Sequence, residues 1–300
     1  MSRVHDALRR LERAGVTLPG ATTAASPTPD WAAALHGLLE QVQEVPWDPA
    51  AEAHIIDAQR PAEFPAEEFR SLRTRLNHLQ GSRPLHTLVV TSASPAEGKS
   101  FTAANLAVAE SHLQGNYTLL ADFDFRRPTV HNLFKVDRSP GLSEYLEGKA
   151  SLAEIIKRVG NTNLFICPAG SAVINPLELL NLKEVRLLIE RLPSIFNWVI
   201  LDTPPLLFAA DANLLSTYCD GSLMVVRLGQ TTIDSITRAI QGMSHNNVVG
   251  VVANAAKRGE LYSKYTYYHS YYYYNEDGEG KAAPPADAAP AEHPDSDSDS

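Results

Sequence analysis

The sequence predicts an α/β domain with a mainly parallel central sheet flanked by helices. Short apolar runs of strand length alternate with helical stretches between residues 85 and 256. Runs that are apolar on both faces and separated by helices are typical of parallel strands buried on both sides. The composition agrees with a globular protein, because 44% of the 300 residues are hydrophobic and 20% are charged.

Three segments precede the first expected strand. Residues 1–16 predict a short amphipathic helix, because their apolar residues recur on one stripe. Residues 17–60 are rich in Ala, Thr and Pro, and they predict a linker with one short helix around Trp31 to Val42. Residues 65–80 predict a longer helix with its own apolar stripe.

The expected sheet lies in residues 61–256, which we interpret as one domain. The apolar runs that predict its strands occupy residues 85–93, 116–124, 163–170, 198–203, 221–229 and 248–256. Helices are expected at 99–114, 175–192, 209–217 and 231–244, with a further helical region after residue 125. Residues 257–300 lack the apolar content to fold alone, so we expect a disordered tail.

Charge and aromatic residues are concentrated in that tail. The formal net charge is −9, and residues 275–300 contribute −7 of it, from eight acidic residues and one lysine. Eight of the 11 tyrosines lie between Tyr262 and Tyr274. An acidic chain is poorly suited to a phosphate backbone, so no nucleic-acid partner is expected. Two cysteines exclude a disulfide framework, and no apolar run reaches the ~18 residues of a membrane-spanning helix.

The strongest motif follows the first expected strand of the domain, at residues 93–100. It matches the phosphate-binding pattern G-x-x-x-x-G-K-[ST], except that Ala93 stands in place of the first glycine. Backbone N–H groups of such a loop surround a phosphate, the lysine reaches the β- and γ-phosphates, and the hydroxyl binds Mg²⁺. We therefore expect ATP and Mg²⁺ as cofactors. The expected nucleotide contacts are Ser94, Pro95, Ala96, Glu97, Gly98, Lys99, Ser100 and Phe101.

Two acidic motifs follow later strands. Asp122 and Asp124 come at the end of the second expected strand, and Asp202 comes at the end of the fourth. Residues two apart on a strand project to the same side, and ligands bind where parallel strands end. Carboxylates there can hold Mg²⁺ and accept a proton, and an apolar strand ending in Asp is the Walker B arrangement. The expected metal ligands are Ser100, Asp124 and Asp202.

Together these motifs resemble those of the bacterial tyrosine kinases of polysaccharide export, which are P-loop autokinases with a MinD/ParA-like deviant Walker fold. Residues 92–100 resemble the family's Walker A, residues 122–128 (D-F-D-F-R-R-P) its Walker A′, and residues 202–205 (D-T-P-P) its Walker B. The tyrosine cluster resembles the autophosphorylated tail of the family. The N-terminal helix on a separate chain resembles the exosortase-associated subgroup.

The resemblance implies a protein-tyrosine autokinase that transfers the ATP γ-phosphoryl group to its C-terminal tyrosines and regulates exopolysaccharide polymerisation and export. Asp122 would be the base or would orient the hydroxyl, and Arg126 would contact phosphate or the incoming tyrosine. Asn254 matches a position that touches adenine in this superfamily, although a strand-end turn residue is the other interpretation. The implied catalytic residues are Lys99, Asp122, Asp124, Arg126 and Asp202. The implied phosphoacceptors are Tyr262, Tyr265, Tyr267, Tyr268, Tyr271, Tyr272, Tyr273 and Tyr274.

The resemblance also implies partners. Glu67-x-x-Arg70-x-x-Arg73 resembles the family's oligomerisation motif, and these positions share a broad helix face that a neighbouring subunit could meet. A solvated charged face is the other interpretation. The implied assembly is a homo-oligomer, such as a ring in which one subunit's tail enters the next site. A separate membrane chain-length protein would activate this cytoplasmic chain and recruit it peripherally to the inner membrane face, and a tyrosine phosphatase would act on it.

Two other functions share the expected fold. A positioning ATPase of the ParA or MinD type usually carries a lysine at the position of Ser94, and it has no role for a tyrosine-rich tail. A non-enzymatic assembly factor with a nucleotide switch would not need the full set of charged motif residues. Detection of phosphotyrosine after incubation with labelled ATP separates the three functions.

Overall fold

The computed structural model describes residues 37, 39–57, 65–243 and 247–256. The chain divides into Met1–Asn254 and Ala255–Ser300, and the described strands and helices lie in the first unit. The helix expected at 1–16 and the tyrosine-bearing tail at 257–300 lie outside the described residues, and the helix around Trp31 to Val42 is described only in part.

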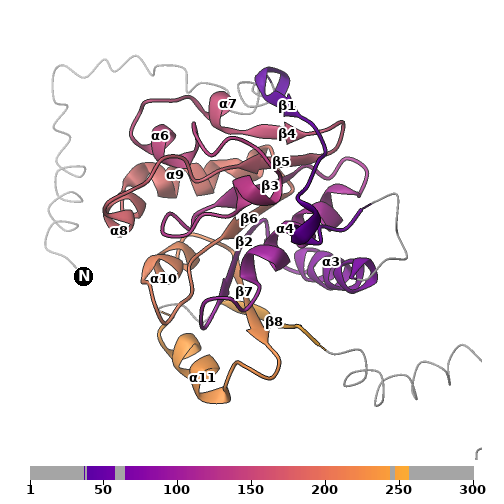
Figure 1. Ribbon diagram of the computed structural model, residues 1–300, viewed down its shortest axis with the longest axis vertical. Helices are drawn as coiled ribbons and strands as arrows, with labels where there is room; N and C mark the ends of the chain where they lie inside the picture. The colour runs from indigo at the N-terminus through magenta and orange to yellow at the C-terminus, as the bar shows by residue number, and fades with distance from the viewer. Residues whose placement is uncertain (1–36, 38, 58–64, 244–246, 257–300) are drawn as a thin grey trace, which may run out of the picture. The chain divides into compact units, whose positions relative to one another are not determined.

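An eight-stranded sheet forms the centre of this unit (Figure 1). Its spatial order is β1-β4-β5-β3-β6-β2-β7-β8, and all neighbours are parallel except β4 and β5. The predicted α/β fold with a mainly parallel sheet is therefore confirmed. The strands are β1 (Gln43–Val45), β2 (Thr87–Ser92), β3 (Thr118–Asp122), β4 (Lys157–Val159), β5 (Leu164–Cys167), β6 (Trp198–Asp202), β7 (Gly221–Arg227) and β8 (Val248–Asn254).

Helices cover both faces of the sheet. On one face α3 (Ala66–Gln80) packs on α4 (Lys99–Ser111), where the rings of Phe69 and Phe101 meet edge to face. The other helices are α5 (Val130–Leu133), α6 (Leu142–Leu146), α7 (Leu152–Ile155), α8 (Pro176–Leu180), α9 (Lys183–Arg191), α10 (Asp211–Ser216) and α11 (Ile233–Gln241). The described residues also form two 3-10 turns, η1 (Ala51–Ala53) and η2 (Leu192–Ser194). No helix among the described residues is long and apolar enough to span a membrane.

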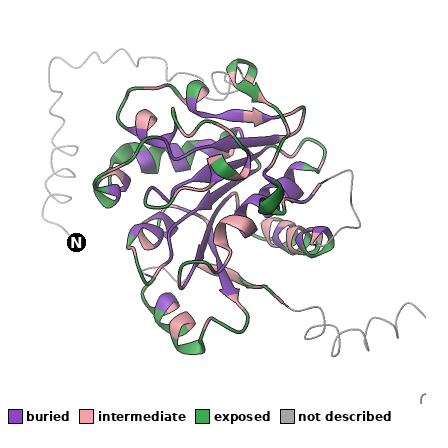
Figure 2. Cartoon of the chain, in the orientation of Figure 1, coloured by how far each residue is buried: buried purple, intermediate pink, exposed green. Residues whose placement is uncertain are grey.

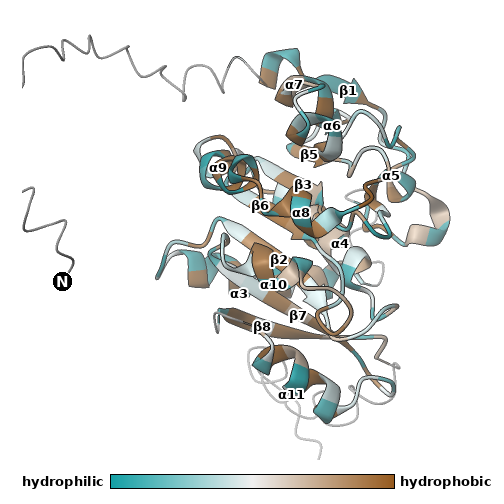
Figure 3. Cartoon of the chain, turned by 90° about the vertical axis from the view of Figure 1, so that its left-hand side faces the viewer, coloured by the Kyte–Doolittle hydropathy of each residue, from teal (hydrophilic) through white to brown (hydrophobic). Residues whose placement is uncertain are grey.

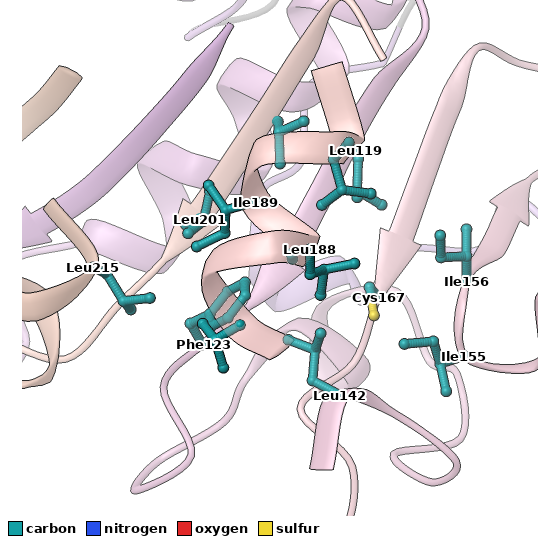
Figure 4. Packing of buried hydrophobic residues seen from close by; sticks show 14 of the residues in the cluster. Leu119, Phe123, Leu142, Ile155, Ile156, Cys167, Leu188, Ile189, Leu201 and Leu215 are labelled. Carbon is teal, nitrogen blue, oxygen red and sulfur yellow. The ribbon is translucent and has the colours of Figure 1, made fainter. Parts of the chain in front are cut away.

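Successive residues of the central strands face opposite cores. Leu201 of β6 joins a cluster with Phe123 and Leu188, which Figure 4 shows from close by. Its neighbour Ile200 joins a second cluster with Leu106 of α4. Because side chains alternate along a strand and both sets are apolar, the strands appear in the sequence as continuous apolar runs. Figure 2 shows these strands buried, and Figure 3 shows apolar strands inside and hydrophilic residues on outer helices.

The structure differs from the sequence prediction at one edge of the sheet. Gln43–Val45, within the segment that we interpreted as a linker, forms β1 and pairs in parallel with β4. Neither strand contains an apolar run of the predicted length. Lys157 donates through Nζ to Oε1 of Gln43, so polar side chains contribute to this pairing. The pairing depends on the open edge of β4, which local sequence does not reveal.

The helix predicted at 175–192 is interrupted. It consists of α8, α9 and η2, because Leu182 is extended, with φ −62° and ψ 142°, and precedes the first residue of α9. The break lets the chain turn between two short helices, and both contribute buried leucines to one cluster, Leu180 from α8 and Leu188 from α9. An amphipathic pattern alone does not locate such a break, since the apolar positions continue across it.

Candidate active site

The loop at residues 93–98 joins β2 to α4 and carries the phosphate-binding motif. Gly98 has φ 94° and Ala96 has φ 62°, so both lie in the left-handed region that favours glycine. Ala93 does not have a positive φ, unlike Ala96 and Gly98. Its methyl group is therefore accommodated where the motif has glycine, and it packs in a small cluster with Met224 and Val226.

Glu97 braces this loop from within. Its Oε2 accepts the backbone N–H of Ser94 at 2.9 Å, and its Oε1 accepts the hydroxyl of Thr231 at 2.6 Å. The side chain of Glu97 is buried, and a buried carboxylate requires donors of this kind. The sequence predicted Glu97 as a nucleotide contact, whereas its side chain is engaged with polar groups of the protein and shapes the loop.

The ends of β7 and β8 hold the same loop from outside. Arg227 donates from Nη1 to the carbonyl oxygen of Ala96 at 3.0 Å, and Asn254 donates from Nδ2 to the carbonyl oxygen of Glu97 at 2.9 Å. A Cβ atom added at Gly98 would overlap the amide nitrogen of Asn254. Asn254 therefore lies against the loop, and only glycine leaves room for it there.

Lys99 lies among acidic side chains at the first residue of α4. Its Nζ is 2.8 Å from Oδ2 of Asp124 and 3.5 Å from Oδ1 of Asp202, and it donates to Oγ of Ser100 at 3.1 Å. The β3–β6 register pairs Asp122 with Asp202, so the two acidic motifs end at the same level of the sheet. The structure thus brings together Lys99, Asp122, Asp124 and Asp202. Glu97 instead faces the loop, and Arg126 pairs with a residue outside the motifs.

Electrostatics couple these groups. Burial lowers the pKa of Lys99, but the charges of Asp202 and Asp124 outweigh burial and raise it above its ordinary value. Burial raises the pKa of Asp202, and the positive charge of Lys99 opposes that shift only in part. One ammonium therefore faces several carboxylates, and additional positive charge would stabilise the cluster.

A divalent cation fits this charge balance. Asp202 is fully buried, and neither of its carboxylate oxygens has a hydrogen-bond partner of good geometry among the described residues. Such a carboxylate is costly unless cations lie beside it. No group of three or more His, Cys, Asp or Glu side chains in the described residues could hold a metal by itself. Mg²⁺ would therefore also use the Ser100 hydroxyl, water and phosphate oxygens, as it does in phosphate sites.

Asp122 organises the acidic loop that follows β3. Its Oδ1 accepts the N–H of Asp124 at 3.1 Å, and its Oδ2 accepts the N–H groups of Thr129 and Val130 at 2.9 and 3.0 Å. Burial raises the pKa of Asp122, the charge of Asp202 adds to the increase, and these N–H bonds oppose it. A carboxylate oxygen has two lone pairs, so Oδ1 keeps one acceptor position.

Arg126 forms an ion pair that the sequence did not predict. Its Nε and Nη2 donate to Oδ2 and Oδ1 of Asp211 at 2.9 and 3.1 Å. Asp211 is the first residue of α10 and is fully buried, whereas 45% of the Arg126 side chain is exposed. Asp211 lies in the first turn of α10, and the local sequence does not reveal its partner, which is 85 residues away.

The three residues of the oligomerisation motif do not form one free charged face. Glu67 and Arg70 pair within α3 at 3.1 Å. Arg73 donates from Nη1 to the carbonyl oxygen of Ala109 on α4. Glu67 and Arg70 are therefore available to a partner as a pair, while Arg73 contributes to the packing of α3 on α4.

The sequence pattern does not reveal three residues near the site, namely Arg227, Thr231 and Asp211. Arg227 ends an expected strand, and polar residues at strand ends of a parallel sheet are the only signal that could have identified it. Thr231 and Asp211 contact residues 134 and 85 positions away, and no local pattern records such a pairing. The tyrosines predicted as acceptors lie outside the described residues.

Curated relatives of the chain are tyrosine-protein kinases. The sequence is 34% identical over 217 residues to tyrosine-protein kinase YwqD of Bacillus subtilis (strain 168), covering 72% of this chain and 91% of that protein. It is 34% identical over 204 residues to tyrosine-protein kinase etk of Escherichia coli (strain K12), covering 67% of this chain and 28% of that protein. The chain thus spans most of YwqD but less than a third of etk. No protein-family model matches it.

Solved structures agree in fold. The kinase domain of Escherichia coli tyrosine kinase ETK matches with a TM-score of 0.62 and 31% identity, over 69% of this chain and 83% of that chain. The septum site-determining protein MinD from Pyrococcus horikoshii, complexed with Mg-ADP, matches with a TM-score of 0.50 and 18% identity, over 59% and 72%. The likeness to MinD shows the fold alone. The loop before α4 leads into a helix N-terminus, where backbone N–H groups suit a phosphate group.

Proposed function

Because this chain belongs to the bacterial tyrosine-protein kinase family, we propose that it transfers the γ-phosphoryl group of ATP to tyrosine hydroxyls of its own C-terminal tail. The observation that carries the proposal is the ammonium of Lys99, which lies between the buried carboxylates of Asp124 and Asp202 at the first residue of α4. A cation and carboxylates at the start of a helix suit a phosphoryl group and Mg²⁺ together.

The nucleotide would lie on the loop at the start of α4. Backbone N–H groups from Ala96 onward and the ammonium of Lys99 would hold its phosphates, since Pro95 has no N–H and that of Ser94 is bonded to Glu97. Asn254 would contact the adenine from the end of β8. Ser100, Asp124 and Asp202 would hold Mg²⁺, which when bound neutralises charge on the β- and γ-phosphates. The carboxylate of Asp202, which is fully buried and 3.5 Å from the ammonium of Lys99, supports this assignment.

The proposed reaction is a displacement at the γ-phosphorus. The tyrosine oxygen forms the new P–O bond as the bond to the ADP oxygen breaks, and the phenolic proton passes to Asp122. A free tyrosine has a pKa of about 10, so a proton acceptor is useful at neutral pH. The open acceptor position on Oδ1 of Asp122 suits this role. Lys99 would offset charge that develops on the departing ADP.

The tail of one subunit would be phosphorylated in the active site of a neighbouring subunit. The last strand ends at Asn254, so Tyr262 and Tyr274 follow it by at most roughly 30 and 70 Å of fully extended chain. The first tyrosines are tightly tethered, while the distal ones can reach a second site. Phosphorylation between subunits of a homo-oligomer, for which a ring is one form, is therefore part of the proposal. The exposed Glu67–Arg70 pair supports α3 as one contact surface.

Mixing two variants tests transfer between subunits. One chain carries Lys99→Ala and an intact tail, and the other keeps Lys99 but lacks residues 257–300. We expect phosphotyrosine on the intact tail only in the mixture, because the inactive chain supplies the acceptor and the truncated chain the site. The Lys99→Ala chain alone is the control. An unphosphorylated tail in the mixture would overturn the intermolecular route.

Incubation with labelled ATP separates kinase activity from the alternatives. A tyrosine kinase yields phosphotyrosine on the chain, a positioning ATPase yields free phosphate without phosphotyrosine, and a nucleotide-switched assembly factor yields neither. Relatives named as a putative tyrosine-protein kinase EpsB and a putative tyrosine-protein kinase in a cps region support a role in exopolysaccharide production.

The remaining parts of the proposal concern location and partners. The chain would work in the cytoplasm and be recruited to the inner membrane face by a separate chain-length protein, with a tyrosine phosphatase reversing the modification. The helix predicted at 1–16 is the proposed docking element. Membrane recruitment retained after deletion of residues 1–16 would argue against that assignment, while recruitment lost on deletion would support it.

A further inference from the structure

The pair formed by Arg126 and Asp211 is asymmetric in its exposure to solvent. The carboxylate of Asp211 is fully buried, while 45% of the Arg126 side chain is exposed. A pair of this kind is not a surface ion pair, because burying a carboxylate is costly without a partner. Arg126 is the partner that makes the burial of Asp211 tolerable, and Asp211 in turn restricts where the guanidinium can lie.

The geometry of the pair fixes the guanidinium plane. Two different nitrogens, Nε and Nη2, donate to two different oxygens of one carboxylate. Bidentate pairing of this kind sets orientation as well as distance. It uses two of the five N–H bonds of the guanidinium, so three remain for another acceptor.

Both partners are anchored to the loops of the active site. Arg126 belongs to the loop held by Asp122, and in that loop Oδ1 of Asp124 accepts the N–H of Arg127 at 2.9 Å. On the other side, residues 203–210 join β6 to Asp211, and Leu206 and Leu207 donate from their N–H groups to the carbonyl oxygens of Ser92 and Ala93. The pair therefore connects the loop after β3 to the loop after β6, beside the phosphate-binding loop.

The charge environment indicates what the remaining N–H bonds can bind. Arg126 is two residues from Asp124, whose other oxygen is 2.8 Å from the ammonium of Lys99. A guanidinium there supplies positive charge at the edge of a site built for phosphate, and a planar set of donors suits a phosphoryl group. A solvent-exposed arginine without the Asp211 contact would sample many rotamers and lose entropy on binding.

We propose that Asp211 is a positioning residue, which holds Arg126 so that its remaining N–H bonds meet the phosphoryl group during transfer. The inference rests on the proposed function for the identity of the group, since it concerns the same site. It predicts that the pair stabilises the γ-phosphoryl group during transfer and has little effect on the affinity for ADP.

Three variants form the test: Asp211→Asn, Arg126→Gln and the double variant. Asparagine keeps the shape of Asp211 but can accept only one of the two N–H bonds. We expect Asp211→Asn to lower the kcat of tyrosine phosphorylation at least about ten-fold with unchanged ADP affinity. Because both variants remove one interaction, the double variant should lose no more than Arg126→Gln alone. Glu190→Gln, which breaks the exposed Arg186–Glu190 pair on α9, is the matched control and should leave both readouts unchanged.

A second readout separates this inference from the proposed function. Affinity for ADP with aluminium fluoride, a planar analogue of the phosphoryl group in transit, does not depend on any tyrosine acceptor. We expect Asp211→Asn to weaken it at least about ten-fold while ADP alone binds as before. If the wild-type chain forms no phosphotyrosine, the kinase proposal is refuted. The positioning role is kept if Asp211→Asn still weakens binding of the analogue and leaves binding of ADP unchanged. Equal affinity of wild type and variant for the analogue would overturn the positioning role.

The test also covers a structural role for Asp211. A structural role predicts that Asp211→Asn lowers the affinity for ADP and for ADP with aluminium fluoride by the same factor. It also predicts that Asp211→Asn lowers kcat equally in the presence and absence of Arg126. Either result overturns the proposal. If Asp211→Asn does not fold, Arg126→Lys tests the same contact by changing the exposed partner of the pair. Lysine keeps the charge but cannot form the two-nitrogen contact, so it should lose as much kcat as Arg126→Gln, and wild-type kcat would overturn the proposal.

Discussion

At the residue scale, Gly98 shows how little freedom the phosphate-binding loop has. It has a positive φ of 94°, and the space where a Cβ would lie is filled by the amide of Asn254. Either constraint alone favours glycine, and here they act together. The second constraint exists because β8 ends beside the loop, so the requirement for glycine comes partly from a strand more than 150 residues later.

Replacing Gly98 with alanine should impair nucleotide binding. The methyl group would displace Asn254 from the carbonyl oxygen of Glu97 and would force a positive φ on alanine, so we expect ADP affinity to fall at least about ten-fold. Calorimetric titration with Mg-ADP measures it. Gly115→Ala is the matched control, because Gly115 also has a positive φ, of 72°, but its added Cβ would meet nothing within 4 Å. Equal affinities for the two variants would contradict this prediction.

At the element scale, a buried glutamate connects two helices and the central sheet. Glu110 of α4 accepts N–H bonds from the side-chain amides of Asn77 on α3 and of Asn116. Asn77 in turn accepts the indole N–H of Trp198 on β6. Burial raises the pKa of Glu110 to about 7, against the opposing effects of Asn77, of the Arg73 charge and of Asn116. The helix that begins at the phosphate-binding loop therefore contains an acid that titrates near neutral pH.

This shift predicts how stability depends on pH. The folded-state pKa of Glu110 lies above its unfolded value of 4.5, so the folded chain holds the proton more tightly. The resulting stability is complete below pH 4.5 and is lost as pH rises through 7, which amounts to about 3 kcal/mol in the free energy of unfolding. Glu110→Gln cannot titrate, so its unfolding free energy relative to the wild type should increase by roughly that amount between pH 5 and 8.

Urea unfolding at several pH values measures this difference. The matched control is Glu68→Gln, since Glu68 also lies on the α3–α4 side of the sheet but is exposed to solvent. We expect its stability relative to the wild type to stay constant across the same range. Parallel pH profiles for the wild type and Glu110→Gln would show that Glu110 does not titrate between pH 5 and 8.

At the scale of the whole molecule, charge is distributed unevenly along the chain. Residues 275–300 carry −7 of the net −9, and the tyrosine cluster directly precedes them. Each phosphate adds about −1.5 to −2 charges at neutral pH. A phosphorylated tail would therefore add several like charges to a region that is already acidic, and in an oligomer several such tails would repel one another.

Phosphorylation should weaken self-association for this reason. Light scattering before and after incubation with Mg-ATP measures the molar mass, and we expect it to decrease as tyrosines are modified. The Lys99→Ala chain, treated identically, serves as the control and should keep its mass. The mass should recover in high salt, which screens the repulsion. An unchanged mass after stoichiometric phosphorylation would contradict the prediction.

Local sequence was sufficient to predict the α/β class, the strand–loop–helix that opens α4 and the identity of the acidic residues around Lys99. These features depend on short-range patterns, namely apolar runs of strand length, the G-K-S signature, and aspartates at strand ends. The order of the strands, the incorporation of β1 and the partners of Glu97, Arg126 and Gly98 became evident only in the folded chain. Those outcomes depend on contacts between residues far apart in the sequence, because a buried carboxylate or a strand edge takes whichever donor the fold brings to it.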